Sequence, residues 1–150
     1  MVTSRALGGF AVSGKSTFRL TFHVSHPAIS AAEIEKVFDL PIRFSQSIGN
    51  QKKTKSGKLL SGNYKLTNVS FCLHDLPLNF DDISVDAFLK KQLESYDDDY
   101  IGHLVESGGS CNFLLGVFSS DNVMFEISHE VISMLSTVKI SIKYDFYGGE

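Results

Sequence analysis

The sequence of 150 residues contains no tryptophan, only two cysteines and no long apolar run. Both cysteines, Cys72 and Cys111, lie in apolar segments with strand character, which favours buried, reduced thiols over a disulfide. No stretch approaches the roughly 18 consecutive apolar residues that span a bilayer. Residues 6–12, which follow Arg5, make a poor export signal because they are few, weakly apolar and include two glycines. We therefore expect a cytoplasmic protein that does not cross a membrane.

The composition is that of one globular domain. Hydrophobic residues make up 43% of the chain and charged residues 21%, and 12 phenylalanines predict a Phe-rich core. The net charge of −3 is unevenly distributed: residues 1–74 hold ten Lys or Arg against three Asp or Glu, and residues 75–150 hold four against fourteen. If the two halves lie on different sides of the molecule, the resulting dipole steers charged partners. If they interleave in one sheet, much of it cancels.

The first half of the chain predicts a strand, a helix and a long connection. Apolar and polar residues alternate over 17–25, which is the period of a strand. Ser30 and Glu33 then form a capping box at a helix start, and Pro41 ends that helix. Residues 45–62 are rich in Ser, Gly, Asn and Lys, and we expect a long, mobile, Lys-rich hairpin or loop.

The second half predicts a longer series of elements. Apolar residues at spacings of three and four predict one long helix from the cap Ser84 to about Ser107. The other expected elements are a strand at 64–74 with a bulge near Asn68, a central strand at 111–119 buried on both faces, a short strand at 123–127, a helix from its cap Ser128 to about Ser136 and a last strand at 138–147. The order β-α-β(β)-α-β-β-α-β predicts one α+β domain over residues 1–150, a mostly antiparallel sheet with helices packed on one face.

The segment GFAVSGKS, residues 9–16, matches the phosphate-binding loop pattern GxxxxGK[ST]. Such a loop needs a buried strand before the glycines and a helix after them. Here no apolar run precedes the glycines, and the alternating strand pattern follows. We interpret residues 1–16 as a flexible or edge segment whose glycines lead into the first strand. The alternative is a nucleotide-phosphate site formed by Gly14, Lys15 and Ser16.

Acidic residues supply the candidate partner-binding site. Asp97, Asp98 and Asp99 lack the spacing of a calcium loop, and within a helix they form a solvated polar face by default. Together with Asp81, Asp82 and Tyr100 they would suit a cationic partner, because carboxylates complement positive charge and tyrosine supplies amphipathic contact area.

Other chemistry is less well supported, and we expect no enzyme activity, no metal and no cofactor. His23 and His26 are three residues apart at a strand end, so their side chains point to opposite faces and make a poor zinc pair. Cys72 and His74 lack an orienting third group, which argues against a Cys/His nucleophile. The Lys-rich residues 45–62 could bind phosphates, but this segment contains no aromatic residue, so we favour a solvated loop over a nucleic-acid site.

The pattern resembles a bacterial family known as domain of unknown function 4279. The resemblance rests on the helix opening ISAAEI at residues 29–34 and on GVFSSDNVMFEISHEVISMLSTVKISIKYDFY at residues 116–147, and it covers about residues 17–148. Some members look like immunity proteins encoded beside secreted bacterial toxins. The resemblance therefore implies a non-enzymatic protein of contact-dependent growth inhibition that occludes a cognate, basic toxin, of which a nuclease is one example. The alternative function is binding of a small ligand or a nucleotide phosphate.

Overall fold

The computed structural model of the protein describes residues 16–148. Its strands are β1 (Thr17–His26), β2 (Ile42–Gln46), β3 (Gln51–Lys53), β4 (Leu59–Asn63), β5 (Thr67–Cys72), β6 (Leu78–Asn79), β7 (Ser110–Ser119) and β8 (Ile140–Gly148). Its helices are α1 (Ala31–Phe38), α2 (Val85–Ser95), α3 (Asp98–Glu106) and α4 (His129–Val138). None of the helices in this part of the chain is long and apolar enough to cross a membrane.

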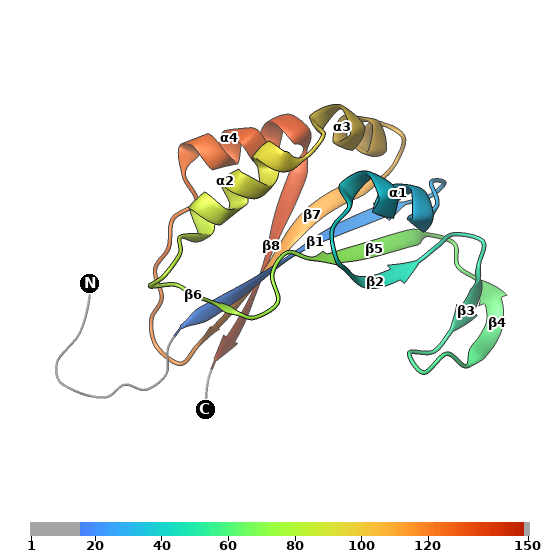
Figure 1. Ribbon diagram of the computed structural model, residues 1–150, viewed down its shortest axis with the longest axis horizontal. Helices are drawn as coiled ribbons and strands as arrows, with labels where there is room; N and C mark the ends of the chain where they lie inside the picture. Colours follow the sequence, from blue (N-terminus) through green and yellow to red (C-terminus); the bar gives the residue numbers. More distant parts are fainter. Residues whose placement is uncertain (1–15, 149–150) are drawn as a thin grey trace.

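The main sheet has the strand order β2-β5-β1-β7-β8, and β6 adds a short pairing to β1. All neighbours are antiparallel except β7 and β8, which are parallel and are joined through α4. β3 and β4 form a separate hairpin that projects from the main sheet (Figure 1). The four helices lie on one face of the main sheet, which confirms the predicted α+β class.

The core lies between the helices and the sheet, and phenylalanine dominates it. Phe22 on β1 is fully buried, and its ring lies 4.9 to 6.3 Å, centroid to centroid, from the rings of Phe38, Phe71, Tyr96 and Phe113. These side chains come from β1, α1, β5, the connection after α2, and β7. Burial of one such ring contributes about 1.5–3 kcal/mol, so this cluster holds the helix layer to the sheet.

Three helices begin at a serine, as the sequence predicts. The hydroxyls of Ser30, Ser84 and Ser128 accept hydrogen bonds from the backbone N–H three residues later, at 3.3, 3.1 and 3.2 Å. Each bond satisfies an N–H that has no partner inside the helix. The first helix ends at Phe38, where Asp39 adopts a left-handed conformation two residues before Pro41.

The prediction of one long helix from Ser84 to Ser107 is wrong. α2 ends at Ser95, Tyr96 is extended, and α3 begins after the N-cap Asp97. The spacing of apolar residues continues across this break because Tyr96 and Tyr100 both pack against the core. A periodic pattern alone therefore hides the break.

Three predictions about strands also need correction. Residues 123–127 form no strand; they belong to the connection between β7 and α4, and β7 pairs directly with β8. The irregular register lies on β2 between Ile42 and Phe44, and the pairing of Asn68 with β1 is regular. β7 is an interior strand, but only its helix-facing side is buried throughout; Asn112 and Leu114 on the other side are half-buried. The Lys-rich residues 45–62 contain the end of β2 and the β3–β4 hairpin.

The two differently charged halves of the chain lie side by side. β2, β5, β1, α1 and the hairpin come from the first half, whereas β7, β8, α2, α3 and α4 come from the second. Within the described residues, 16–74 hold eight Lys or Arg against three Asp or Glu, and 75–148 hold four against thirteen. The halves meet along the β1–β7 pairing; among the described strands β6 of the second half pairs with β1 on its other edge, so most of the charge asymmetry is retained in space.

The two ends of the main sheet differ in how well they are covered. At one end, which we call the closed end, His26, Cys111 and Ile140 are at most 5% exposed. At the other, which we call the open end, Phe118 and Phe146 are 37% and 65% exposed. Because β7 and β8 are parallel, both strands run from the closed end to the open end.

Candidate protein-binding surface

A hollow of about 370 Å³ lies at the start of α2. The turn before the helix is fixed by Asn79: its side-chain oxygen accepts from the N–H of Asp81 at 2.9 Å, and its backbone oxygen accepts from the N–H groups of Asp82 and Ile83. Ser84 then caps α2. These local bonds place Asp81 and Ile83 on the wall of the hollow.

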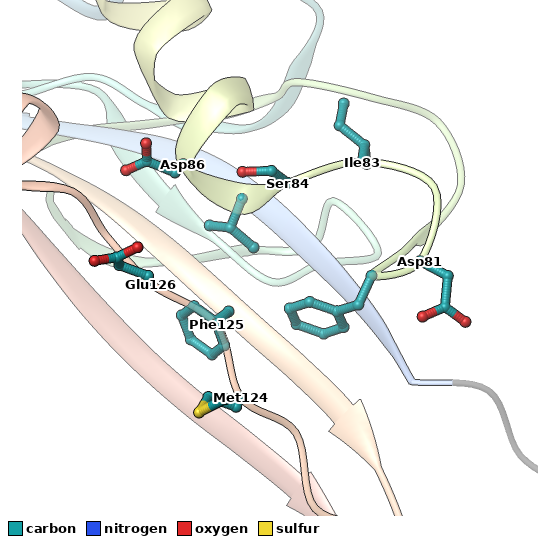
Figure 2. A pocket seen from close by; sticks show the side chains of 9 residues that line it. Asp81, Ile83, Ser84, Asp86, Met124, Phe125 and Glu126 are labelled. Carbon is teal, nitrogen blue, oxygen red and sulfur yellow. The ribbon is translucent and has the colours of Figure 1, made fainter. Parts of the chain in front are cut away.

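The opposite wall is the extended segment that leads from β7 to α4. It contributes Met124, Phe125 and Glu126 (Figure 2). Met124 is 96% exposed, which is unusual for a large apolar side chain at a concave surface. The complete lining is Phe80, Asp81, Ile83, Ser84, Val85, Asp86, Met124, Phe125 and Glu126, which contains three carboxylates and no cationic side chain.

Two contacts hold the walls together. The Asp86 carboxylate accepts a hydrogen bond of 2.5 Å from the backbone N–H of Ser128, the cap of α4. One turn further along α2, the Lys90 ammonium lies 3.1 Å from the Glu130 carboxylate of α4. The starts of α2 and α4 are therefore joined beside the hollow. Asp86 is engaged in this hydrogen bond, so Asp81 and Glu126 are the exposed carboxylates of the hollow.

An aromatic strip extends from the hollow to the edge strand β8. It consists of Phe80, Phe125, Tyr144 and Phe146, whose successive ring centroids are 5.5, 6.5 and 6.3 Å apart. Tyr144 and Phe146 are 48% and 65% exposed. The strip adjoins the hollow through Phe80 and Phe125, and the exposed lining of the hollow is mainly polar, with charges that are all negative.

The structure divides the predicted acidic patch between the two ends of α2. Asp81 and Asp82 precede the helix, and residues 97–100 follow it. The 11 residues of α2 separate the two groups by about 16 Å at 1.5 Å per residue. Only Asp81 lines the hollow, and Asp82 is exposed beside it.

The second acidic group has a clear structural role. Asp97 caps α3 by accepting a hydrogen bond from the N–H of Tyr100 at 3.1 Å. Asp98 and Asp99 occupy the first turn, where negative charges interact favourably with the helix dipole. Tyr100 packs edge-on against Phe38 at 6.0 Å. Burial, with a smaller effect of a nearby carboxylate, raises the pKa of Tyr100.

The phosphate-site alternative lacks its helix. β1 begins at Thr17, directly after the GK[ST] pattern, so a strand follows the pattern where a phosphate-binding loop requires a helix. The Ser16 hydroxyl lies 2.6 Å from the Ser119 hydroxyl at the end of β7. Gly14 and Lys15 lie outside the described residues.

Histidine and cysteine side chains are engaged in structure. His74 Nε2 accepts from the N–H of Leu20 at 3.0 Å, so its Nδ1 carries the proton and donates to the carbonyl oxygen of Leu76. Both cysteines are free; Cys72 is half-buried, and burial raises the pKa of the Cys111 thiol to about 12, which keeps it protonated. Across residues 16–148, no group of three or more His, Cys, Asp or Glu could hold a metal ion.

Sequence reasoning missed Met124, Phe125 and Glu126. Apolar and polar residues alternate here, which predicts a short strand at 123–127. This prediction places Phe125 in the sheet and not at the surface. The sequence does contain a signal: the polar, loop-forming residues Ser-Ser-Asp-Asn at 119–122 end β7. They leave little length for a further paired strand before the cap at Ser128.

Comparison with protein-family models, curated proteins and solved structures finds no match to this chain.

Proposed function

We propose that this protein binds another protein through the hollow at the start of α2, and that the partner is a basic toxin which it neutralises without catalysis. The observation that carries the proposal is the combination of exposed Met124, the aromatic strip and an all-acidic rim. An exposed apolar patch with a polar rim is typical of protein-interaction sites.

Met124 and Phe125 would supply the affinity. Transfer of an exposed Met side chain into a partner's pocket gains about 1.5–3 kcal/mol from burial. Its unbranched thioether adapts to partner surfaces of different shape. Phe125 is held against Phe80 at 5.5 Å, so little of its rotamer freedom remains to be lost on binding.

Asp81 and Glu126 would supply orientation and speed of association. Figure 2 places them on opposite sides of Phe125, with no cation on the lining between them. The acidic half of the chain around them extends the negative field, which raises association rates with a cationic partner. A nuclease, whose substrate is a polyanion, is one such partner.

Neutralisation of a toxin is the part of the proposal that rests on the family resemblance. Immunity proteins are encoded beside their toxins, so the first experiment is co-expression with the product of the neighbouring gene. We expect the two to co-purify and growth to be rescued. No complex and no rescue would remove the toxin assignment.

Matched variants then locate the surface. The double reversal Asp81→Lys/Glu126→Lys should slow association by about tenfold at low salt, with a smaller effect at high salt. Met124→Ser should mainly speed dissociation. The control is Lys55→Glu/Lys58→Glu on the β3–β4 hairpin, which changes the same number of charges on the basic half.

Variants of the acidic residues at the other end of α2 test whether the binding surface lies there and not at the hollow. Asp98→Lys/Asp99→Lys spares the cap Asp97 and, because these residues lie about 16 Å from the hollow, should slow association much less than Asp81→Lys/Glu126→Lys does. If this variant abolished binding while Asp81→Lys/Glu126→Lys did not, the binding surface would lie at α3 and the hollow would be the wrong assignment.

A further inference from the structure

β8 is an unpaired edge of the main sheet. Its nine residues, Ile140–Gly148, pair with β7 on one side, and among residues 16–148 no strand pairs with the other. Long edge strands with exposed aromatic residues are templates for pairing with another chain unless they are blocked. β8 contains no proline and has no irregularity in its register with β7.

The two faces of β8 carry different side chains. Ile142, Tyr144 and Phe146 lie beside the buried β7 residues of the helix face, with Tyr144 paired to Leu115. Lys143 and Asp145 lie on the opposite face, where Lys143 is exposed and Asp145 is half-buried. The Asp145 carboxylate accepts a hydrogen bond from the Tyr147 hydroxyl, which leaves its other oxygen available.

The sequence of β8 is complementary to itself in one antiparallel register. Tyr144 is the central residue of the nine, so a two-fold axis through it pairs the full strand with a second copy. In this register Lys143 faces Asp145 of the second copy, and Asp145 faces its Lys143. On the other face, Ile142 lies opposite Phe146. Opposite charges and apolar pairs placed directly across two strands are stabilising.

Other registers are disfavoured by the same residues. An axis through Lys143 places two lysines opposite each other, and an axis through Asp145 places two aspartates opposite each other; like charges in such positions are destabilising. An axis that passes between two neighbouring residues places side chains of the helix face of one copy opposite side chains of the other face of its partner. Axes through Ile142 or Phe146 avoid like charges but pair only part of the nine-residue strand, so the register about Tyr144 is the one that combines full pairing with opposite charges.

We propose that two copies of this chain associate through β8 with β8, in antiparallel register about Tyr144, to form one continuous sheet across a two-fold axis. Each contact then occurs twice, as in any isologous interface. The hollow at α2 contains no residue of β8, but the aromatic strip of the proposed toxin-binding surface includes Tyr144 and Phe146, so the two surfaces meet along the helix face of β8.

Charge reversal tests the proposal directly on the full chain. The wild-type protein should sediment as a dimer. Lys143→Asp places two Asp–Asp pairs in the interface, and Asp145→Lys places two Lys–Lys pairs. Each should weaken the dimer by about tenfold or more. The control Lys58→Asp, on the hairpin, should leave the mass unchanged.

Restoration by complementary charges makes the test specific. The swapped variant Lys143→Asp/Asp145→Lys should recover the dimer, and a mixture of the two single variants should form the heterodimer, which native mass spectrometry distinguishes by mass. Circular dichroism checks that each variant is folded. A monomeric wild type, or single reversals that remain as dimeric as the wild type, would overturn the proposal.

Discussion

The closed and open ends of the main sheet use similar side chains with opposite results. At the closed end, α3, α4 and the turn after α3 cover the sheet, and His26 is 1% exposed. At the open end β6 continues the sheet beside β1, and Phe146 remains 65% exposed. Aromatic content alone therefore does not identify a core. Phe22 is in the core because α1, β5, β7 and the connection after α2 contribute rings around it. Phe146 is at the surface because no element covers it.

The largest expected effect contrasts those two phenylalanines. Phe22→Ala removes a fully buried ring and should lower the free energy of unfolding by about 3–5 kcal/mol. Phe146→Ala should lower it by less than about 1 kcal/mol, because most of the ring is already in water. Urea unfolding at low protein concentration measures both. Comparable losses for the two variants would mean that the open end is covered in solution.

Two glycines give the next contrast. A Cβ atom on Gly109, at the closed end, would lie 2.7 Å from the backbone oxygens of Ser25 and Leu104 and from the His26 ring. Gly109→Ala should therefore cost about 1–3 kcal/mol, since the backbone must move. Gly148→Ala, at the open end, meets no atom within 4 Å and should be nearly neutral. Thermal unfolding of the two variants tests this, and a neutral Gly109→Ala would contradict the close packing.

The smallest effect concerns pH. His26 Nδ1 accepts the N–H groups of Ala28 and Ile29, both at 2.9 Å, so the folded state requires a neutral ring. Burial, with a nearby histidine, lowers its pKa in the folded state. The unfolded chain therefore binds the proton more readily. Stability is full above the ordinary value of about 6.5 and falls as the pH drops below it.

Chemical unfolding at about pH 7.5 and about pH 5.5 measures this loss. Burial and the charges of Arg43 and Lys143 also lower the pKa of His23, so it contributes in the same direction. His26→Gln should reduce the pH dependence, and the double variant with His23→Gln should reduce it further. A pH dependence unchanged in the double variant would assign it to other groups.

Local signals predicted most of the fold. Alternation identified β1, and the serine caps identified three helix starts, because both depend on neighbouring residues. The parallel pairing of β7 with β8 and the break at Tyr96 depend on residues far apart in the sequence. The hollow was missed for the same reason: its two walls, at Asp81 and Phe125, are separated by more than forty residues.

The central position of β1 determines when the chain can fold during synthesis. β1 is the first of the described strands to be made, yet its neighbours are β5 and β7, and Thr17 pairs with Phe118. Until β7 leaves the ribosome, one edge of the central strand β1 has no partner, and loop closure over such distances slows folding. The nascent protein should therefore depend on chaperones until β7 has left the ribosome.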